Sequence, residues 1–274
     1  VLKVCARTTG AYARVRQQFN VPLSRFEGVQ EAMARIAANT YVIDAARNVT
    51  AGALDIGEEP SVLSAVLKYQ ATERMRASVN DAMDDHGGRA ICDGPSNYLF
   101  HPYMAAPVAI TVEGANILTR SLIIFGQGAV RCHPWLLEEM NAAALDDPDE
   151  ALARFDGAFM GHVGHILTNL ARAAFRNLTG GVFGSDPSVG EVNYWYAQLE
   201  RASASFAVVA DATLAQLGGA LKRREMLSGR FADVLGELYL LSCAIKHFED
   251  GGRSTAELPL LEFAMRDGLY TVQI

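Results

Sequence analysis

The chain has 274 residues, of which 50% are hydrophobic and 20% are charged, with 24 Lys and Arg against 31 Asp and Glu. This composition buries enough apolar surface for one or two globular domains and excludes a disordered chain. A net charge of −7 offers no positive field to a phosphate backbone, so we expect no nucleic acid partner.

Two helical patterns occupy the first part of the chain. The first begins directly at Val1, without a preceding Met, so we expect the chain to be part of a longer protein. The second begins near Phe26 and should stop near Gly57. Ser24 and Glu27 predict an S-x-x-E capping box at its start, because each side chain can satisfy a free backbone N–H.

A third helical pattern begins at Pro60 and ends at Gly87 and Gly88, since proline suits a first helical turn and glycine a helix end. Three polar residues form its last turn and predict a solvated helix end without chemistry of its own: Asp84, Asp85 and His86.

Residues 89–112 contain three prolines and predict an irregular connection. The run EGANILTRSLIIF then returns to a helical pattern, which His133-Pro134 breaks. Further helices are expected at 135–144, 149–178, 191–217 and 225–249, with a last one at LLEFAMRDGLYTV. Alternating β patterns are almost absent. The predicted fold class is therefore all-α, with packed long helices followed by a second helical region.

The apolar runs and the cysteines indicate the kind of compartment. The most apolar runs fall short of the roughly 18 residues that a membrane-spanning helix needs, so we predict no transmembrane segment. Cysteines occur without a CxxC pair and predict reduced thiols in a reducing compartment: Cys5, Cys92, Cys132 and Cys243.

Two further motifs are weak signals. His162 and His165 have a spacing that metal ligands use, but any helix places i and i+3 side by side and no other ligand motif supports them. We therefore predict no metal site. The aromatic run 194–196 fits either an anchor for a partner contact or the packed start of a helix.

Glu113 is a lone carboxylate after the apolar run PVAITV. Gly114 and Ala115 follow it, and their small size would let a flat ligand approach the backbone. A carboxylate in such a place can act as a general base. A glutamate that interacts with the dipole of a helix start is the alternative, and position alone favours neither.

Three sequence blocks resemble, in order, the C-terminal helical domain of the flavin-dependent acyl-CoA dehydrogenases: YARVRQQFNVPLSRFEGVQ at 12–30, NDAMDDHGGRAI at 80–91 and VEGANILTRS at 112–121. The longer strings around the last two resemble the large bacterial fatty-acid (FadE-type) branch, which carries an extra helical region. We therefore expect residues 1–133 to be the FAD-binding helical domain, truncated at its N-terminus, and residues 134–274 to be the branch-specific extension.

The resemblance implies a cofactor site for FAD. Arg16 and Phe19 stand where the family loop contacts this cofactor, the arginine reaching its pyrophosphate, often that of a neighbouring subunit. A guanidinium suits this role, since its planar fork binds phosphate oxygens in pairs. Gly87 and Gly88 match the turn beside the adenosine end of FAD.

The resemblance also implies the catalytic group. Glu113 matches the base that removes the α-proton of the acyl thioester, and it matches, together with Gly114, the segment that holds the substrate. The implied activity is oxidation of medium- or long-chain fatty acyl-CoA to trans-2-enoyl-CoA in β-oxidation, with electrons leaving through an electron-transfer flavoprotein. A homodimer, in the cytoplasm or peripheral at the inner membrane, is the implied setting.

Two alternatives stay open. The enzyme could be an acyl-CoA oxidase that uses O₂, or the isolated chain could be a non-catalytic helical assembly module, since the family's other two domains are missing from it. The isolated chain is expected to be inactive. Five positions also depart from the family pattern, with acidic side chains at two of them that are unfavourable near a flavin phosphate unless paired: Asn20, Glu27, Asp84, Val112 and Ala115.

Overall fold

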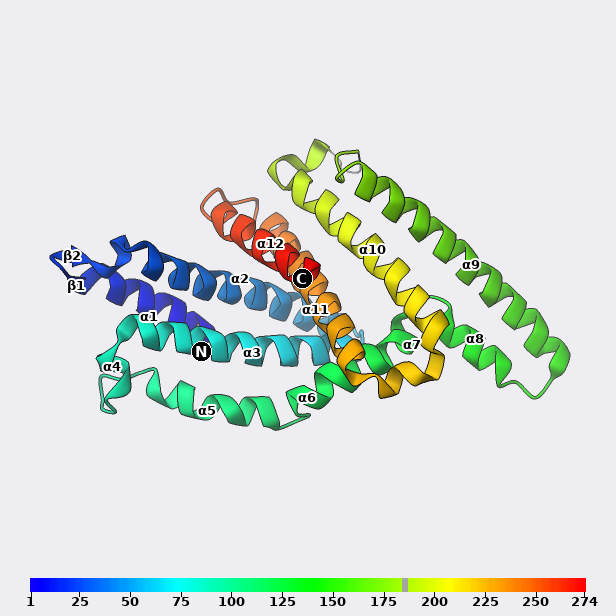
Figure 1. Cartoon of the computed structure of the whole chain (residues 1–274), viewed down its shortest axis with the longest axis horizontal. Coiled ribbons are helices and arrows are strands. Elements are labelled where there is room, and N and C mark those ends of the chain that lie inside the picture. The colour runs from blue at the N-terminus through cyan, green and yellow to red at the C-terminus, as the bar shows by residue number, and fades with distance from the viewer. Residues whose placement is uncertain (184–186) are drawn as a thin grey trace. The chain divides into compact units, whose positions relative to one another are not determined.

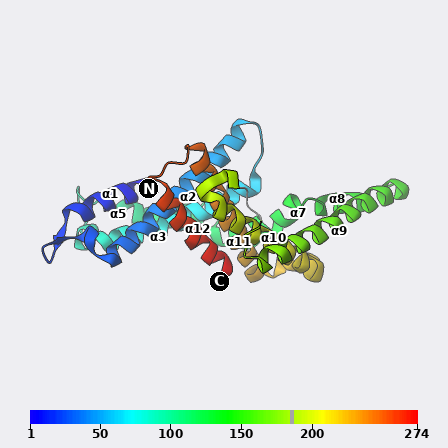
Figure 2. The same cartoon turned by 90° about the horizontal axis from the view of Figure 1, so that it is seen from above.

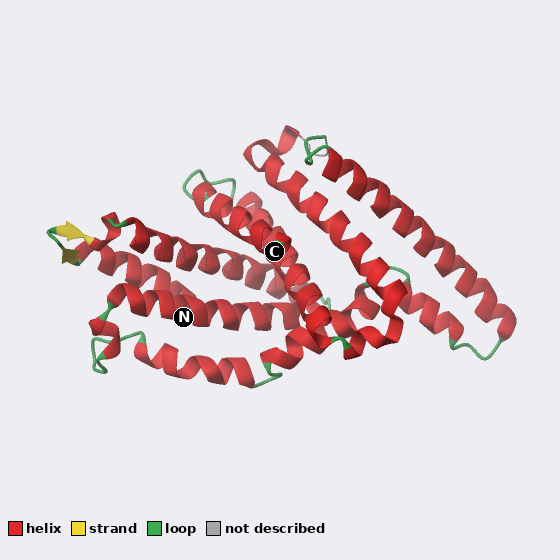
Figure 3. Cartoon of the chain, viewed as in Figure 1, coloured by secondary structure: helices red, strands yellow, loops and turns green. Residues whose placement is uncertain are grey.

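A computed structural model describes residues 1–183 and 187–274. Helices make up most of the described chain, and one short antiparallel hairpin joins the first two long helices (Figure 3). The all-α fold class is thus confirmed. The chain forms two compact units, unit 1 with residues 1–116 and 239–270, and unit 2 with residues 117–238 and 271–274. The sequence-based boundary between residues 133 and 134 stays a prediction.

Unit 1 is a bundle of long helices followed by a returning C-terminal pair (Figure 1). Its elements are α1 (Leu2–Val15), β1 (Gln17–Gln18), β2 (Val21–Pro22), the 3₁₀ turn η1 (Leu23–Arg25), α2 (Glu27–Asp55), α3 (Ser61–His86), α4 (Gly88–Ile91), α5 (Phe100–Thr111), the last part of α11 (Glu225–Asp250) and most of α12 (Leu258–Gln273).

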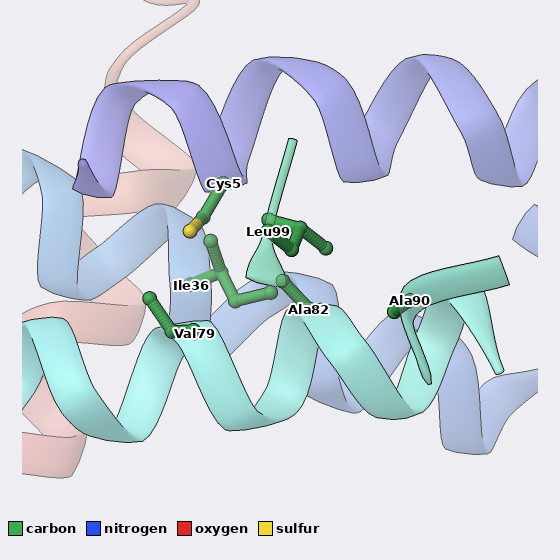
Figure 4. Close-up of a cluster of buried hydrophobic side chains, with 6 residues drawn as sticks. All are labelled: Cys5, Ile36, Val79, Ala82, Ala90 and Leu99. Carbon is green, nitrogen blue, oxygen red and sulfur yellow. The ribbon is translucent and has the colours of Figure 1, made fainter. Parts of the chain in front are cut away.

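The core of unit 1 forms where α1, α2 and α3 pack together. Cys5 of α1, Ile36 of α2 and Val79 of α3 are fully or almost fully buried against one another (Figure 4). Ala82 adds a small side chain that lets the helices approach closely. The chain after α3 closes this core, because Leu99 is also buried in it. Burial of this apolar face is the main stabilisation of the three helices.

The start of α2 differs from the prediction. Phe26 occupies the N-cap position and no side chain caps the helix, so the predicted capping box of Ser24 and Glu27 is wrong. Ser24 lies inside the 3₁₀ turn η1, and its carbonyl oxygen instead accepts a hydrogen bond from Gln30 Nε2 at 2.8 Å. The tight turn that leads out of the hairpin therefore replaces the usual cap.

The expected irregular connection at 89–112 contains a regular helix, α5. Asn97 organises its start, since the buried Oδ1 accepts from the backbone N–H groups of Leu99 and Phe100 at 3.1 and 3.0 Å. Pro102 falls in the first turn, where a missing N–H costs nothing, and Pro107 lies on the exposed side. Proline content alone was thus a misleading signal for this segment.

Unit 2 contains a long helical hairpin with shorter helices beside it. Its elements are most of α6 (Asn116–Leu118), the π-helical segment η2 (Thr119–Gln127), α7 (Gly128–Cys132), α8 (Leu136–Ala143), α9 (Pro148–Leu178), the 3₁₀ turns η3 (Pro187–Val192) and η4 (Gly218–Arg223), α10 (Asn193–Leu217) and the first part of α11. Figure 2 shows α8 and α9 side by side, as in Figure 1. The predicted break at His133-Pro134 is confirmed, since α7 ends at Cys132.

Aromatic rings form the core of unit 2. Phe125 stacks on Phe231 with ring centroids 4.5 Å apart, and Phe206 meets both rings edge to face. Trp195, within the aromatic run 194–196, is buried in the first turn of α10, which agrees with a packed helix start. Tyr194 points outward and is 60% exposed.

One helical stretch, Gly190–Arg223, is long and apolar enough to cross a membrane by length and composition, whereas the sequence predicts no such span. The stretch also carries Glu200, which forms an ion pair with Arg176 of α9, and Asp211, which is buried. All four cysteines are free thiols, with Cys5 and Cys243 buried and Cys92 and Cys132 exposed.

Candidate functional site

The hairpin after α1 carries the first two predicted cofactor residues. Arg16 ends α1, and the strands pair Gln17 with Pro22 across a two-residue turn at Phe19 and Asn20. Both turn residues have positive φ angles, 53° and 62°, as a type I′ turn requires. Asparagine tolerates this conformation, whereas a bulky phenylalanine adopts it at a cost.

The side chain of Phe19 is exposed to solvent rather than packed in the core. Its side chain is 88% exposed, and its ring meets Phe26 edge to face at 6.5 Å between centroids. An exposed aromatic residue held in a strained turn at the tip of a hairpin is suited to contact a ligand or a partner chain.

The glycine pair at the end of α3 forms the second predicted cofactor element. Gly87 has φ 60° and ψ −137°, a conformation that residues with a Cβ atom rarely adopt, and Gly88 begins α4. A Cβ atom added at either glycine would meet nothing within 4 Å. The backbone conformation therefore requires Gly87, and the space beside both residues is open to a ligand.

A cavity of about 710 Å³ connects the hairpin after α1 with the glycine pair at the end of α3. We call it the arginine cavity. It is lined by Tyr12, Val15, Arg16, Gln17, His86, Gly88 and Arg89. The rings of Tyr12 and His86 stack with centroids 4.3 Å apart, and the Arg89 guanidinium lies 5.9 Å from the Tyr12 ring. The structure thus brings Arg16 and Gly88 together in one cavity, while Phe19 is not among the lining residues.

His86 forms a neutral wall of this cavity. Its Nδ1 lies 2.7 Å from the carbonyl oxygen of Ala82 and therefore carries the proton, so Nε2 accepts from the Tyr98 hydroxyl at 2.5 Å. Burial lowers the pKa of His86, and the positive charge of Arg89 lowers it further. The cationic charge of the cavity therefore comes from its two arginines.

The two guanidinium groups leave the cavity with uncompensated positive charge. Within the part of the chain that the structure describes, no carboxylate forms an ion pair with Arg16 or Arg89. Paired guanidinium forks beside an open glycine turn suit the oxygens of a phosphate or pyrophosphate group.

The predicted solvated end of α3 is wrong for two of its three residues. His86 is buried and is part of the cavity wall, and Asp85 is partly buried. Burial raises the pKa of Asp85 to about 6, and repulsion by Asp81 and Asp84 adds to this shift. Only Asp84 is exposed. Tyr12 of α1 stacks on His86, and this contact between two helices is not visible in the sequence pattern of α3 alone.

Glu113 lies in the turn between α5 and α6, and its side chain is exposed. Its φ angle of 52° is unusual for a residue with a side chain, and Gly114 follows with φ 91°. The first turn of α6 contains no acidic residue, so Glu113 does not have the helix-start role that was the alternative interpretation.

Lys68 of α3 holds this turn. Its Nζ donates to the carbonyl oxygens of Ile110 at 3.3 Å and Gly114 at 2.7 Å, and to Asn116 Oδ1 at 2.7 Å. These three acceptors lie on both sides of Glu113 in the chain. Charge-assisted hydrogen bonds are stronger than neutral ones, so the ammonium group fixes the strained backbone around Glu113.

Asn116 adds a second attachment to α3. Its Nδ2 donates to Thr72 Oγ1 at 2.9 Å and to Glu73 Oε1 at 2.8 Å, and the residue is 3% exposed. The turn that carries Glu113 is therefore set by a buried polar network rather than by packing alone.

The turn at Glu113 and the arginine cavity lie at opposite ends of α3 (Figure 1). Nineteen positions separate Lys68 from Gly87, and the helical rise puts about 28 Å between them. The structure thus brings Arg16 and the glycine pair together and leaves Glu113 apart from them.

Several residues of these two places were missed by the sequence patterns. Tyr12 and Lys68 look like ordinary polar positions on amphipathic helices, and nothing local signals their long-range contacts. Arg89 could have been found, because it follows the glycine pair directly in the sequence.

Comparisons with known proteins cover both parts of the chain. Residues 1–125 match the family model described as acyl-CoA dehydrogenase, C-terminal domain. Residues 130–274 match the model described as acyl-CoA dehydrogenase, C-terminal, bacterial type.

Two individual proteins illustrate the similarity. A crystal structure of an acyl-CoA dehydrogenase complexed with FAD from Bacillus anthracis has the same fold, with a TM-score of 0.74 and 16% identity over 99% of this chain and 45% of that chain. A 3-(aryl)acrylate reductase from Clostridium sporogenes (strain ATCC 15579) is 35% identical over 82 residues, which is 28% of this chain. The chain spans less than half of the first protein and 20% of the second. Since the bacterial-type model alone matches more than half of the residues, the chain belongs to the acyl-CoA dehydrogenase family.

Proposed function

We propose that this chain contributes the catalytic base and part of the flavin site to an enzyme that oxidises medium- or long-chain fatty acyl-CoA to trans-2-enoyl-CoA. The observation that carries the proposal is the turn at Glu113, which Lys68 holds in a strained conformation. The sequence resemblance assigns the family base to this position. The membership of the chain in the acyl-CoA dehydrogenase family supports it.

The residues at the other end of α3 fit FAD. Arg16 and Arg89 present two guanidinium groups without carboxylate partners among the described residues, and the backbone at Gly87 and Gly88 leaves open space beside them. These groups would hold the pyrophosphate and the adjoining adenosine. Asp84 is exposed and outside the lining of this cavity, which limits its repulsion of the phosphates. FAD, when bound, accepts the hydride that leaves the β-carbon.

Glu113 takes the α-proton in this proposal. An exposed carboxylate on a fixed turn can meet a substrate that the rest of the enzyme delivers, and the hydrogen bonds of Lys68 keep it in place while the proton moves. Gly114 lets the thioester approach the backbone, since no side chain stands there.

The distance of about 28 Å along α3 supports a homodimer. In a dimer the arginine cavity of one chain can serve the flavin beside Glu113 of the other, so one chain need not bridge the gap. An electron-transfer flavoprotein as the electron acceptor and a cytoplasmic or inner-membrane-peripheral location complete the proposal.

A second candidate reaction follows from the curated relative, which is an acrylate reductase. The same carboxylate, when protonated, would return a proton to the α-carbon of a 2-enoyl substrate, which is the reverse of the first reaction. The direction of turnover distinguishes these candidates: the oxidation proposal expects reduction of an artificial dye with acyl-CoA and no consumption of enoyl-CoA by a reduced donor.

The decisive experiment uses the full-length enzyme with Glu113→Gln. We expect the dye-coupled oxidation rate to fall roughly 10²–10⁴-fold, the usual contribution of a general base. Glu58→Gln, an exposed glutamate in the connection before α3, serves as the control and should change nothing. A normal rate in Glu113→Gln contradicts the base assignment, and peroxide formed in air at the dye-coupled rate shows an oxidase instead.

The isolated chain gives an independent test of the assembly-module alternative. Because it carries only part of the flavin site, we expect no turnover and weak or no FAD binding. A purified 274-residue chain with near-stoichiometric flavin absorbance contradicts this expectation.

A further inference from the structure

Unit 2 contains a buried group of imidazoles and carboxylates that the proposed reaction does not use. His133 lies between α7 and α8, Glu139 on α8, His162 on α9 and Asp211 on α10. We call these four residues the histidine cluster. The side chains are between 5% exposed, for Asp211, and 18% exposed, for His162. Such burial is unusual for ionisable groups unless they are paired or bind a cation.

The orientation of His162 is set by Glu139. The Nδ1 atom lies 2.7 Å from Glu139 Oε1, so Nδ1 carries the proton and donates it, and the lone pair of the neutral ring is on Nε2. That Nε2 lies 4.0 Å from Asp211 Oδ1 and has no hydrogen-bond partner among the described residues.

Asp211 also has a buried oxygen atom without a hydrogen-bond partner among the described residues. The residue is 7% exposed, and the oxygen atom in question is Oδ2. The cluster therefore places an unpartnered nitrogen, His162 Nε2, 4.0 Å from a buried carboxylate whose Oδ2 is also unpartnered. A cation bound between the ring and the carboxylate would satisfy both atoms.

His133 adds a third donor atom. Its Nδ1 accepts from the backbone N–H groups of Trp135 and Leu136 at 3.2 and 3.0 Å, so the neutral ring carries its proton on Nε2. That Nε2 lies 3.0 Å from Asp211 Oδ1. One potential ligand atom from each of His133, His162 and Asp211 lies within 4.8 Å of the other two.

We propose that the histidine cluster binds a divalent transition-metal ion of the zinc class through His162 Nε2, the Asp211 carboxylate and His133 Nε2. Two imidazoles and a carboxylate match the nitrogen and oxygen donors that zinc accepts, whereas magnesium and calcium prefer oxygen alone. Glu139 takes the role of the carboxylate that orients a metal-binding imidazole. The negative charges of Glu139 and Asp211 balance the two positive charges of the ion.

The three ligands are not equivalent. His162 has an unpartnered Nε2, but His133 can bind through Nε2 only after its proton moves to Nδ1, which breaks the two hydrogen bonds from Trp135 and Leu136. His133 is therefore the weakest ligand, and metal binding weakens as the pH falls because imidazoles bind metals only in their neutral form. Since the ligands come from α9, α10 and the segment before α8, the ion joins the separate segments of the hairpin region.

The sequence alone did not predict this site. His162 and His165 were the visible pair, but His165 Nε2 faces Asn169 Nδ2 at 2.9 Å. The neighbours of His162 are instead Glu139 on α8 and Asp211 on α10. The other pair in the cluster, His133 and Asp211, is separated by 78 positions in the chain.

The test is calorimetric titration of Zn²⁺ into the 274-residue chain after dialysis against a chelator. We expect one ion per chain and a raised Tm. His162→Gln and Asp211→Asn should weaken binding at least 100-fold, and His133→Gln roughly 10-fold. His101→Gln, an exposed histidine of unit 1, is the matched control and should bind as the unaltered chain does. No stoichiometric uptake, or unchanged affinity in His162→Gln, overturns the proposal.

A cobalt experiment keeps the test independent of variant folding. Co²⁺ added to the unaltered chain should give the visible absorption of a low-symmetry nitrogen and oxygen site, without the near-ultraviolet band of cobalt bound to thiolate. A thiolate band would assign the ion to the exposed Cys92 or Cys132 and overturn the proposed ligand set.

Discussion

The ammonium group of Lys68 lies 2.7 Å from the carbonyl oxygen of Gly114, the residue directly after Glu113. The same group donates to Asn116 Oδ1 at 2.7 Å, so one side chain of α3 attaches both the turn and the start of the next helix. Because φ at Glu113 is positive, the turn is strained and depends on such attachments to persist.

Replacement of this lysine should therefore impair catalysis without removing a reacting group. In the full-length enzyme we expect Lys68→Met to lower kcat about 10–100-fold with little change in KM, since misplacement of a base costs rate rather than affinity. Lys68→Arg should restore part of the loss. Lys3→Met, which removes an exposed ion pair with Asp44, is the control. Unchanged kcat in Lys68→Met would show that the turn at Glu113 keeps its conformation without the hydrogen bonds of Lys68.

The arginine cavity predicts a difference between two neighbouring arginines at the end of α1, Arg14 in its last turn and Arg16 directly after it. Arg16 lines the cavity and Arg14, two positions earlier, is exposed and outside it. Loss of a charged contact to phosphate costs about 1.5–3 kcal/mol, so Arg16→Gln in the full-length enzyme should weaken FAD binding roughly 10–100-fold. Arg14→Gln should bind FAD normally. Flavin fluorescence titration of the two apo-enzymes measures both, and equal affinities would remove Arg16 from the site.

The two adjacent glycines should respond differently to alanine. Gly87 needs φ 60°, so Gly87→Ala should destabilise the fold by about 1–3 kcal/mol. Gly88 lies in the first turn of α4 without a positive φ, so Gly88→Ala should be neutral or slightly stabilising. Urea unfolding of the 274-residue variants measures the difference, and equal costs would mean that the positive φ of Gly87 does not select glycine here.

Asp85 gives the fold a dependence on pH. Because its pKa in the folded chain is raised from 3.8 to about 6, the folded state binds the proton more tightly than the unfolded state does. Stability from this group is therefore greatest below about pH 4 and is lost as the pH rises through about 6. Asp85→Asn should stabilise the chain at pH 7.5 by on the order of 1 kcal/mol, after its partial exposure is discounted.

The control for this prediction is Asp84→Asn, which changes an exposed carboxylate one position earlier. Tm values at pH 5 and pH 7.5 should show a smaller pH dependence in Asp85→Asn and an almost unchanged one in Asp84→Asn. A pH dependence that survives Asp85→Asn would assign it to another group.

Proline and glycine at helix ends, together with regular apolar spacing, made the long helices predictable. Pro60 and Gly87 bound α3, and apolar spacing from Phe26 onward defines α2, because these signals act within a few residues. The helix α5 was not predictable in this way, since its start depends on Asn97 bonds that compete with the proline signal.

The candidate sites were predictable only as far as single motifs reach. Arg16, Gly87 and Glu113 came from family blocks, but Lys68 contacts Gly114 across 46 positions and His133 meets Asp211 across 78. Such pairings depend on how helices pack, and periodicity within one helix contains no information about them.

The helix α3 fixes the distance and the orientation between the turn at Glu113 and the arginine cavity. Each residue of an α-helix adds about 1.5 Å of length and about 100° of rotation, so the number of residues between Lys68 and Gly87 fixes both the spacing and the relative facing of the two places. Deletion of a single residue there would shorten the helix only slightly but would rotate Gly87 and Gly88 about the helix axis by more than a quarter of a revolution. The length of this segment is therefore as much a part of the site as the side chains at its two ends.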